Sequence, residues 1–192
     1  RNVLKFIDAV QIQIGASGAY NFTIETILEI HKLTTEKILP TEWHQSQRGY
    51  FTGSLFNAMV DDPRIRLVTI DLGFGMFDKI KEIFPDRFIN TFAAEQAALG
   101  ICVGMSLEGL VPFCYTITSF YLRAAETIAL YAHGEQIPIK MFGSGRDGSY
   151  EHDGPSHHGG LAQAFMGSLN IVGIHPNTKE EIPGVVKEVL YN

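Results

Sequence analysis

Three stretches of the chain carry side chains that could bind or activate a small molecule. The first, residues 87–96, ends on a glutamate, Glu95, and a glutamine. The second places an aromatic ring, Phe120, three residues before a guanidinium, Arg123. The third, residues 152–158, reads His-Asp-Gly-Pro-Ser-His-His. Carboxylates and imidazoles exchange protons, flat rings stack on heterocycles and guanidinium groups pair with anions, so these residue types could serve proton transfer and ligand binding.

Each stretch also has an ordinary structural explanation. A carboxylate in the first turn of a helix favours the positive end of the helix dipole, and an isolated Glu95 would be a solvated residue of this kind. Phe120 could be a core residue. The histidines and aspartate of residues 152–158 could form a metal cluster, but their spacing fits no standard zinc pattern, so we predict no metal site.

Short apolar strands alternating with helical segments must position these side chains. We expect strands at 66–70, 88–89, 110–116, 138–142 and 171–174, and helices at 53–60, 95–106, 120–133, 158–169 and 178–190. The helix from Glu95 should pack through positions 94, 97, 98, 101, 102 and 105, and residues 177–180 should form a capping box. This alternation predicts a three-layer α/β/α sandwich with a mainly parallel sheet.

The expected strand ends gather the candidate residues. Ligands of parallel sheets bind at the carboxyl ends of the strands. Asp71, the loop before Glu95, residues 116–120 and the loop 143–157 all follow strands. We therefore expect them to converge on one edge of the sheet.

Composition limits the classes of function. The 192 residues suffice for one large domain, and a net charge of −6 argues against a nucleic-acid partner. No apolar run reaches membrane-spanning length, because Arg123 and Glu126 interrupt the most apolar region. No signal peptide is recognisable at the start. Cys102 and Cys114 lie in apolar runs without metal or redox spacing, which indicates buried free thiols and a cytoplasmic protein.

The chain divides into a lead-in and a main domain. Residues 1–47 are expected to be a linker that is partly helical over 23–38, with an edge strand at 8–14 as the alternative. Residues 48–192 form the main domain. The first residue is Arg1 rather than methionine, which suggests a trimmed or partial polypeptide.

Taken in order and at these distances, the motifs resemble the pyrimidine-binding (Pyr) domain of the transketolase family of thiamine diphosphate enzymes. The matching blocks are Asn90 followed by Ala-Glu-Gln at 94–96, Gly-Leu-Val-Pro-Phe at 109–113, Phe120 with Arg123, and Asp-Gly-Pro-Ser-His at 153–157. The resemblance covers about residues 48–180. It implies the thiamine diphosphate-binding fold and transferase chemistry.

The resemblance also implies three cofactor-binding residues. Glu95 matches the glutamate that bonds to N1′ of the pyrimidine and exchanges a proton with it, a role that requires a desolvated carboxylate. Phe120 matches the ring that stacks on the pyrimidine. Asp71 matches an aspartate that orders the turn facing the cofactor. Glu95 is thus both a cofactor-binding and a catalytic residue by this comparison.

Four further residues are implied to act on the substrate. His157 matches the histidine that faces the reacting carbonyl, and Asp153 lies near the donor hydroxyls. Arg48 stands where transketolases place a phosphate-binding arginine. Arg123 could meet a substrate anion or pair with a carboxylate at a subunit contact.

Some positions depart from the family pattern. Thr91-Phe92 replaces Gly-Ile, Gly-Phe-Gly follows Asp71 where a serine is common, and Gly145 takes the place of a histidine. Two of three phosphate contacts are therefore missing, which argues against a classical pentose phosphate donor.

The diphosphate and Mg²⁺ are bound in this family by a separate domain carrying Gly-Asp-Gly and a later Asn, and this chain has no such motif. The chain is expected to be inactive alone. A partner chain or a missing region would supply that domain, in a homodimer through Pyr domains or an α2β2 heterotetramer.

The leading hypothesis is transfer of a two-carbon ketol unit from a small sugar or keto acid. A 1-deoxyxylulose-5-phosphate synthase-like enzyme and the β subunit of a 2-oxo acid dehydrogenase are alternatives, although Ser119 and the Asp-Gly-Pro block favour transketolase over the β subunit. A non-catalytic assembly subunit is the alternative from a different class.

Overall fold

The computed structural model describes residues 36–146 and 149–191. Residues from Ile38 onward belong to one compact unit. The expected helix at 23–38 lies outside the described residues except for 36–38, and the alternative strand at 8–14 lies wholly outside them. The described residues therefore comprise the main domain and the short segment that leads into it.

Four parallel strands form the sheet of the described domain, in the order β2-β1-β3-β4. Their bounds are Ile65–Thr69 for β1, Phe88–Asn90 for β2, Val111–Ile117 for β3 and Lys140–Ser144 for β4. The central strands β1 and β3 are almost wholly buried, as parallel strands covered on both faces must be. The prediction of a mainly parallel sheet is confirmed.

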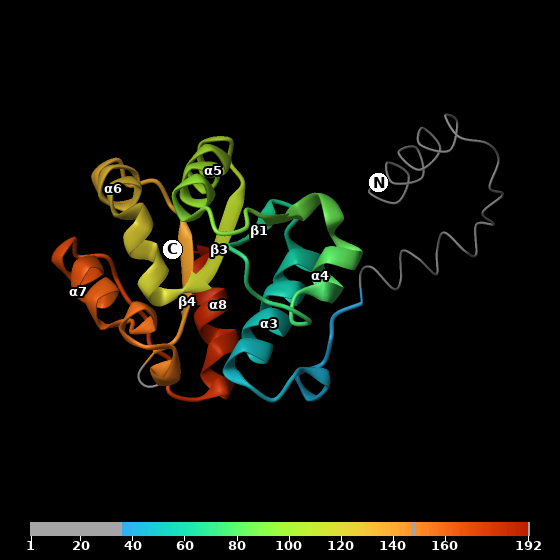
Figure 1. The fold of residues 1–192 in the computed structure, drawn as a ribbon. Helices are drawn as coiled ribbons and strands as arrows, with labels where there is room; N and C mark the ends of the chain where they lie inside the picture. Colours follow the sequence, from blue (N-terminus) through green and yellow to red (C-terminus); the bar gives the residue numbers. More distant parts are fainter. Residues whose placement is uncertain (1–35, 147–148, 192) are drawn as a thin grey trace. The chain divides into compact units, whose positions relative to one another are not determined.

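Helices cover the sheet on both sides (Figure 1). The α-helices are α3 (Gln47–Asp61), α4 (Asp78–Ile83), α5 (Glu95–Leu107), α6 (Ala125–Thr127), α7 (Gly160–Ser168) and α8 (Ile182–Tyr191). The 3₁₀ segments are η1 (Pro40–Glu42), η2 (Pro85–Arg87), η3 (Thr118–Ala124), η5 (Glu151–Asp153), η6 (Pro155–His157) and η7 (Lys179–Glu181), and η4 (Ile128–Gly134) is a π-helical turn. The three-layer sandwich is confirmed, with α3, α4 and α8 on one face and α5, η3, η4 and α7 on the other.

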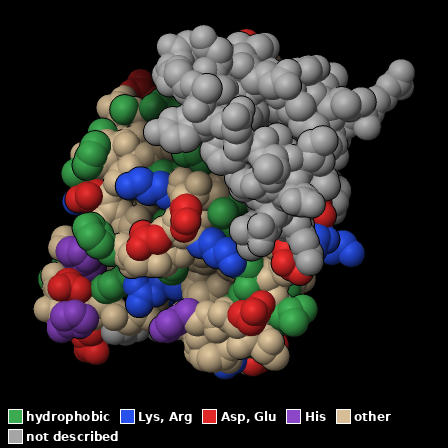
Figure 2. All heavy atoms as spheres, turned by 90° about the vertical axis from the view of Figure 1, so that its right-hand side faces the viewer, with side chains coloured by type: hydrophobic (Ala, Val, Ile, Leu, Met, Phe, Trp, Pro, Cys, Tyr) green, Lys and Arg blue, Asp and Glu red, His purple; other side chains and the backbone are tan. Residues whose placement is uncertain are grey.

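The part of the described surface visible in Figure 2 mixes acidic, basic and histidine side chains rather than separating them by charge. Among the described residues, no helix has the length and apolarity needed to cross a bilayer.

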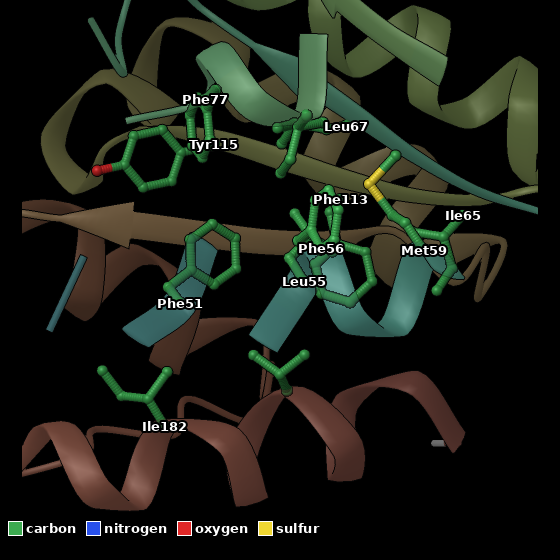
Figure 3. Close-up of a cluster of buried hydrophobic side chains, with 12 residues drawn as sticks. Phe51, Leu55, Phe56, Met59, Ile65, Leu67, Phe77, Phe113, Tyr115 and Ile182 are labelled. Carbon is green, nitrogen blue, oxygen red and sulfur yellow. The ribbon is translucent and has the colours of Figure 1, made fainter. Parts of the chain in front are cut away.

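Aromatic rings dominate the core on the α3 face (Figure 3). Phe51 of α3 is fully buried, and its ring centroid lies 3.7 Å from that of Phe142 on β4 and 5.6 Å from that of Tyr115 on β3. Phe77 meets the Tyr115 ring edge-on at 5.1 Å. These contacts hold α3, and with it the residues of its first turn, against the carboxyl-terminal half of the sheet.

The core on the α5 face contains both cysteines and Tyr121. Cys102 of α5 and Cys114 of β3 are fully buried free thiols, as predicted. A hydrogen bond to Cys114, together with burial, raises the pKa of Cys102. Burial also raises the pKa of Tyr121, whose hydroxyl donates to the carbonyl oxygens of Cys114 and Phe142.

These buried acids predict a loss of stability at high pH. The unfolded chain releases the Cys102 thiol proton above a pKa of about 8.5, whereas the folded chain retains it, so the free energy of unfolding should fall as the pH rises above that value. Urea unfolding between pH 7 and 10 measures the trend, with the Cys102→Ala, Cys114→Ala double variant as control. A wild-type slope no steeper than that of the control would contradict the prediction.

Three local expectations were wrong. Residues 171–174 form no strand but an irregular segment beyond α7, in which Val172 is 86% exposed, and the described sheet ends at β4. Helix α5 packs through Ala98, Leu99, Cys102 and Val103, so its buried face is turned away from Ala97 and Ile101. At the start of η7, the carboxylate that accepts from the backbone N–H of Asn177 belongs to Glu181 and not Glu180.

Candidate active site

The loops after β1 and β2 are tied together by one side chain. Asn90 Oδ1 accepts from the backbone N–H of Asp71 at 3.1 Å and from that of Phe92 at 2.9 Å. Asp71 and Phe92 both have left-handed backbones, with φ of 51° and 53°. Such conformations are costly for residues other than glycine and persist where the surroundings fix them. Asn90 therefore shapes the approach to Glu95, a role that the sequence analysis missed.

Glu95 is the first residue of α5 and its side chain is only 6% exposed. Arg123 Nη1 donates to Glu95 Oε1, and the Arg123 side chain is 53% exposed. The structure thus places a carboxylate in a buried position, as the proposed chemistry requires, but pairs it within the same chain. The partner observed for Arg123 is a carboxylate of its own chain, whereas the sequence analysis expected a substrate anion or a carboxylate at a subunit contact.

Phe120 lies beside this pair on η3. The Arg123 guanidinium carbon is 4.0 Å from the centroid of the Phe120 ring, a cation–π contact. The ring is half-buried and belongs to neither described core cluster, so it is not committed to packing in the core. The His157 ring meets it edge-on at 5.1 Å.

Two serines hold His157. Ser156 Oγ lies 3.0 Å from His157 Nδ1, and Ser119 Oγ donates to the backbone carbonyl of Ser156 at 2.8 Å. Ser119 thereby links η3 to η6. Asp153, on η5, faces His152 at 3.2 Å and is exposed. Across residues 36–146 and 149–191, no group of three His, Cys, Asp or Glu side chains could hold a metal ion.

Arg48 reaches the cluster through Tyr150, which the sequence analysis did not single out. Arg48 Nη1 donates to the Tyr150 hydroxyl at 3.3 Å, and this hydroxyl lies 3.3 Å from Ser144 Oγ. The Tyr150 ring is 6.1 Å from that of His157. Burial raises the pKa of the neighbouring Tyr115 phenol.

A pocket of about 720 Å³ opens beside these residues and is lined by Arg48, Asp71, Tyr115 and Tyr150, among others. A second pocket, of about 440 Å³, shares Arg48, Tyr115 and Tyr150 and continues along the end of β4. The structure therefore joins Glu95, Arg123, Phe120, His157, Tyr150 and Arg48 by successive contacts at the carboxyl ends of the strands. Asp71 lines the larger pocket, whereas Asp153 makes its described ion pair with His152 outside this series.

Gly145 makes room for Tyr150. Its φ is 88°, and a Cβ atom there would lie 2.5 Å from the Tyr150 ring. Gly145→Ala should therefore destabilise the fold more than Gly109→Ala, because Gly109 has a similar φ of 78° but nothing within 4 Å of its Cβ position. Both variants carry backbone strain of about 1 kcal/mol, and only the first adds a clash. Equal shifts of the urea midpoint would show that Tyr150 moves aside freely.

Comparison with known proteins identifies relatives of this chain. Residues 45–191 match the family described as "Transketolase, pyrimidine binding domain". The 1-deoxy-D-xylulose-5-phosphate synthase of Chlorobium phaeovibrioides is 27% identical over 176 residues, which cover 91% of this chain and 27% of the synthase. The probable chloroplastic synthase of Capsicum annuum is 31% identical over 144 residues, covering 74% and 20%.

A solved structure shares the fold. It is described as "Split gene transketolase, inactive beta4 tetramer" and is 23% identical, with a TM-score of 0.61 over 76% of this chain and 48% of that one. The present chain spans about a quarter or less of the two synthases. From the match over residues 45–191, it belongs to the pyrimidine-binding domain family of thiamine diphosphate-dependent transketolases.

Proposed function

We propose that this chain is the pyrimidine-binding half of a transketolase-like enzyme that transfers a two-carbon ketol unit. One observation carries the proposal: a buried carboxylate at the start of α5, Glu95, lies in one cluster with an aromatic ring that the core does not use, Phe120. The relatives named 1-deoxy-D-xylulose-5-phosphate synthase make that reaction the nearest alternative.

The residues present fit the pyrimidine of thiamine diphosphate. A flat heterocycle needs a ring face to stack on and a hydrogen-bond partner for its nitrogen, and these are Phe120 and Glu95. Both are contacted by the planar, nitrogen-rich guanidinium of Arg123, so the cluster accommodates a flat donor group. The cofactor itself supplies the carbanion chemistry of its thiazolium ring.

In this proposal Glu95 holds and returns a proton at the pyrimidine N1′, from a side chain that is only 6% exposed. Phe120 orients the ring. Asp71, fixed by Asn90, orders the turn that faces the cofactor.

On the substrate side, His157 exchanges a proton with the reacting oxygen, and Asp153 lies near the donor hydroxyls. His157 is suited to this role because its ring is fixed by Ser156 and Phe120. Arg48 and Arg123 supply positive charge for a substrate anion. The substrate is a small sugar or keto acid.

We further propose that residues 48–192 are the catalytic half and residues 1–47 a lead-in. A diphosphate-binding domain holds Mg²⁺ and comes from a partner chain or from a region outside this sequence. The solved transketolase of related fold is described as a split-gene protein, which supports an assembly of this kind, and we assign that assembly to the cytoplasm. Homodimer contacts through Pyr domains and an α2β2 heterotetramer are the two arrangements proposed.

Reconstitution tests this proposal. The chain should turn over no ketol donor alone, but should do so when mixed with the diphosphate-domain chain recovered from the same extract, thiamine diphosphate and Mg²⁺. Omitting the cofactor is the control. Turnover by the chain alone, or turnover that does not require the cofactor, would refute the proposal that catalysis needs both this chain and a separate diphosphate-binding domain.

A further inference from the structure

Arg123 makes both contacts that we assign to the pyrimidine. Its guanidinium donates to Oε1 of Glu95 and stands 4.0 Å from the centroid of the Phe120 ring. A guanidinium is flat, carries several N–H donors and stacks on aromatic rings, and it is therefore close in shape and hydrogen bonding to an aminopyrimidine.

The local backbone explains why one side chain can reach both groups. Phe120 and Arg123 lie on the 3₁₀ segment η3, where three residues make one turn and residues i and i+3 lie one above the other. The Arg123 side chain therefore runs over the Phe120 ring. From there it reaches the first residue of α5, which packs against η3.

We propose that Arg123 is an internal stand-in for the pyrimidine, and that cofactor binding displaces it. This inference rests on the proposed function of Glu95 and Phe120. A carboxylate oxygen and a ring face that hold the guanidinium are not open to a second flat group, so the two ligands compete. Arg123 tunes cofactor affinity as a positioning residue that acts through Glu95.

The exposed fractions of the two partners fit an exchange of this kind. The Glu95 side chain is 6% exposed. Without Arg123 its carboxylate would be buried and unpaired, an arrangement that proteins avoid. The Arg123 side chain is 53% exposed and can swing into solvent without opening the core. The pair thus shields the Glu95 carboxylate, and the guanidinium yields to the ring that replaces it.

The stability of the chain without cofactor gives the first test. Arg123→Met keeps the length of the side chain but leaves the Glu95 carboxylate unpaired, so Tm should fall by about 2–4 °C. Adding Glu95→Gln, which removes the charge, should restore most of the loss. A double variant no more stable than Arg123→Met would show that the pair does not protect the carboxylate, and would overturn this part of the inference.

Binding gives the second test. Two probes, thiamine diphosphate with Mg²⁺ and the fragment 4-amino-2,5-dimethylpyrimidine, are titrated into the full chain and followed by NMR and calorimetry. If Arg123 contacts Glu95 and Phe120 about nine-tenths of the time, it lowers the apparent affinity for a competing ligand about ten-fold. Arg123→Met should therefore bind both probes about ten-fold more tightly than wild type. Arg123→Lys, which keeps the charge but loses the planar fork, should lie between them.

Arg64→Met is the matched control. Arg64 is 62% exposed and pairs with Asp62 just before β1, at the opposite end of the sheet from Glu95. Loss of a positive charge should by itself weaken the binding of thiamine diphosphate, which is a polyanion, and Arg64→Met should show this effect. Tighter binding by Arg123→Met would therefore not be explained by the change in charge.

The outcomes separate the two proposals. Tighter binding by Arg123→Met, without tighter binding by Arg64→Met, supports the displacement of Arg123 by the cofactor. Equal or weaker binding relative to wild type overturns the stand-in role but leaves the pyrimidine site in place. If no variant binds either probe, even when mixed with the diphosphate-domain chain, the pyrimidine site itself is wrong and both proposals fall.

Discussion

Glu95→Gln should lower the cofactor-dependent turnover of the reconstituted enzyme by about 10²–10⁴-fold. Glutamine matches glutamate in shape and still accepts a hydrogen bond, but it cannot take up and return a proton at the pyrimidine N1′. Because the site in Glu95→Gln keeps its volume, cofactor affinity should change far less than turnover. Turnover is measured at saturating thiamine diphosphate and Mg²⁺, and affinity by titration of the same samples.

Glu108→Gln serves as the control for this experiment. Glu108 is exposed at the carboxyl end of the same helix and carries the same charge, so turnover should stay at the wild-type level. If Glu95→Gln behaved like Glu108→Gln, the carboxylate would have no catalytic role. The alternative of a non-catalytic assembly subunit would then be the better explanation of the chain.

Phe51→Ala should cost about 3–5 kcal/mol of folding free energy. The Phe51 ring is fully buried between α3 and the sheet and contacts the rings of Tyr115, Phe142 and Phe113. Truncation leaves a cavity that β3 and β4 cannot fill, because the strands are held by the ladder on both sides of β3. Tm should fall by roughly 10 °C, measured by thermal unfolding monitored by circular dichroism.

Phe74→Ala makes the same chemical change at the surface. Phe74 is fully exposed in the loop after β1, so its loss should alter stability by less than about 0.5 kcal/mol. A Phe51→Ala variant as stable as Phe74→Ala would mean that the ring stack adds little to the fold.

Periodicity predicted the sheet but not its limits. The runs that became β1, β3 and β4 are apolar and bounded by turn residues, which suffices to identify a buried strand. Residues 171–174 show the same local pattern and still form no strand in the described structure. A strand also has to lie in register beside a neighbouring strand, and a local window of sequence does not contain that information.

The order of strands and loops predicted that Asp71, the loop before Glu95, residues 116–120 and the loop 143–157 would converge on one edge of the sheet. The structure brings Glu95, Phe120 and His157 into one series of contacts, which runs through Arg123. The pairing of Glu95 with Arg123 could not be predicted from the sequence, because the two residues are 28 positions apart and their contact depends on the 3₁₀ geometry of η3. Tyr150 was missed for a similar reason. Its place depends on the left-handed backbone of Gly145, whereas the sequence shows only one more tyrosine near a glycine-rich loop.

The amide of Asn90 has a consequence for efforts to change what the larger pocket binds. It fastens the turn at Asp71, on the rim of the larger pocket, to the turn at Phe92, three residues before Glu95. A library that randomises residues 72–76 to reshape the pocket would also shift the Glu95 carboxylate without mutating it. Variation in the loops after β1 and β2 should therefore be designed and screened jointly, with Asn90 kept constant.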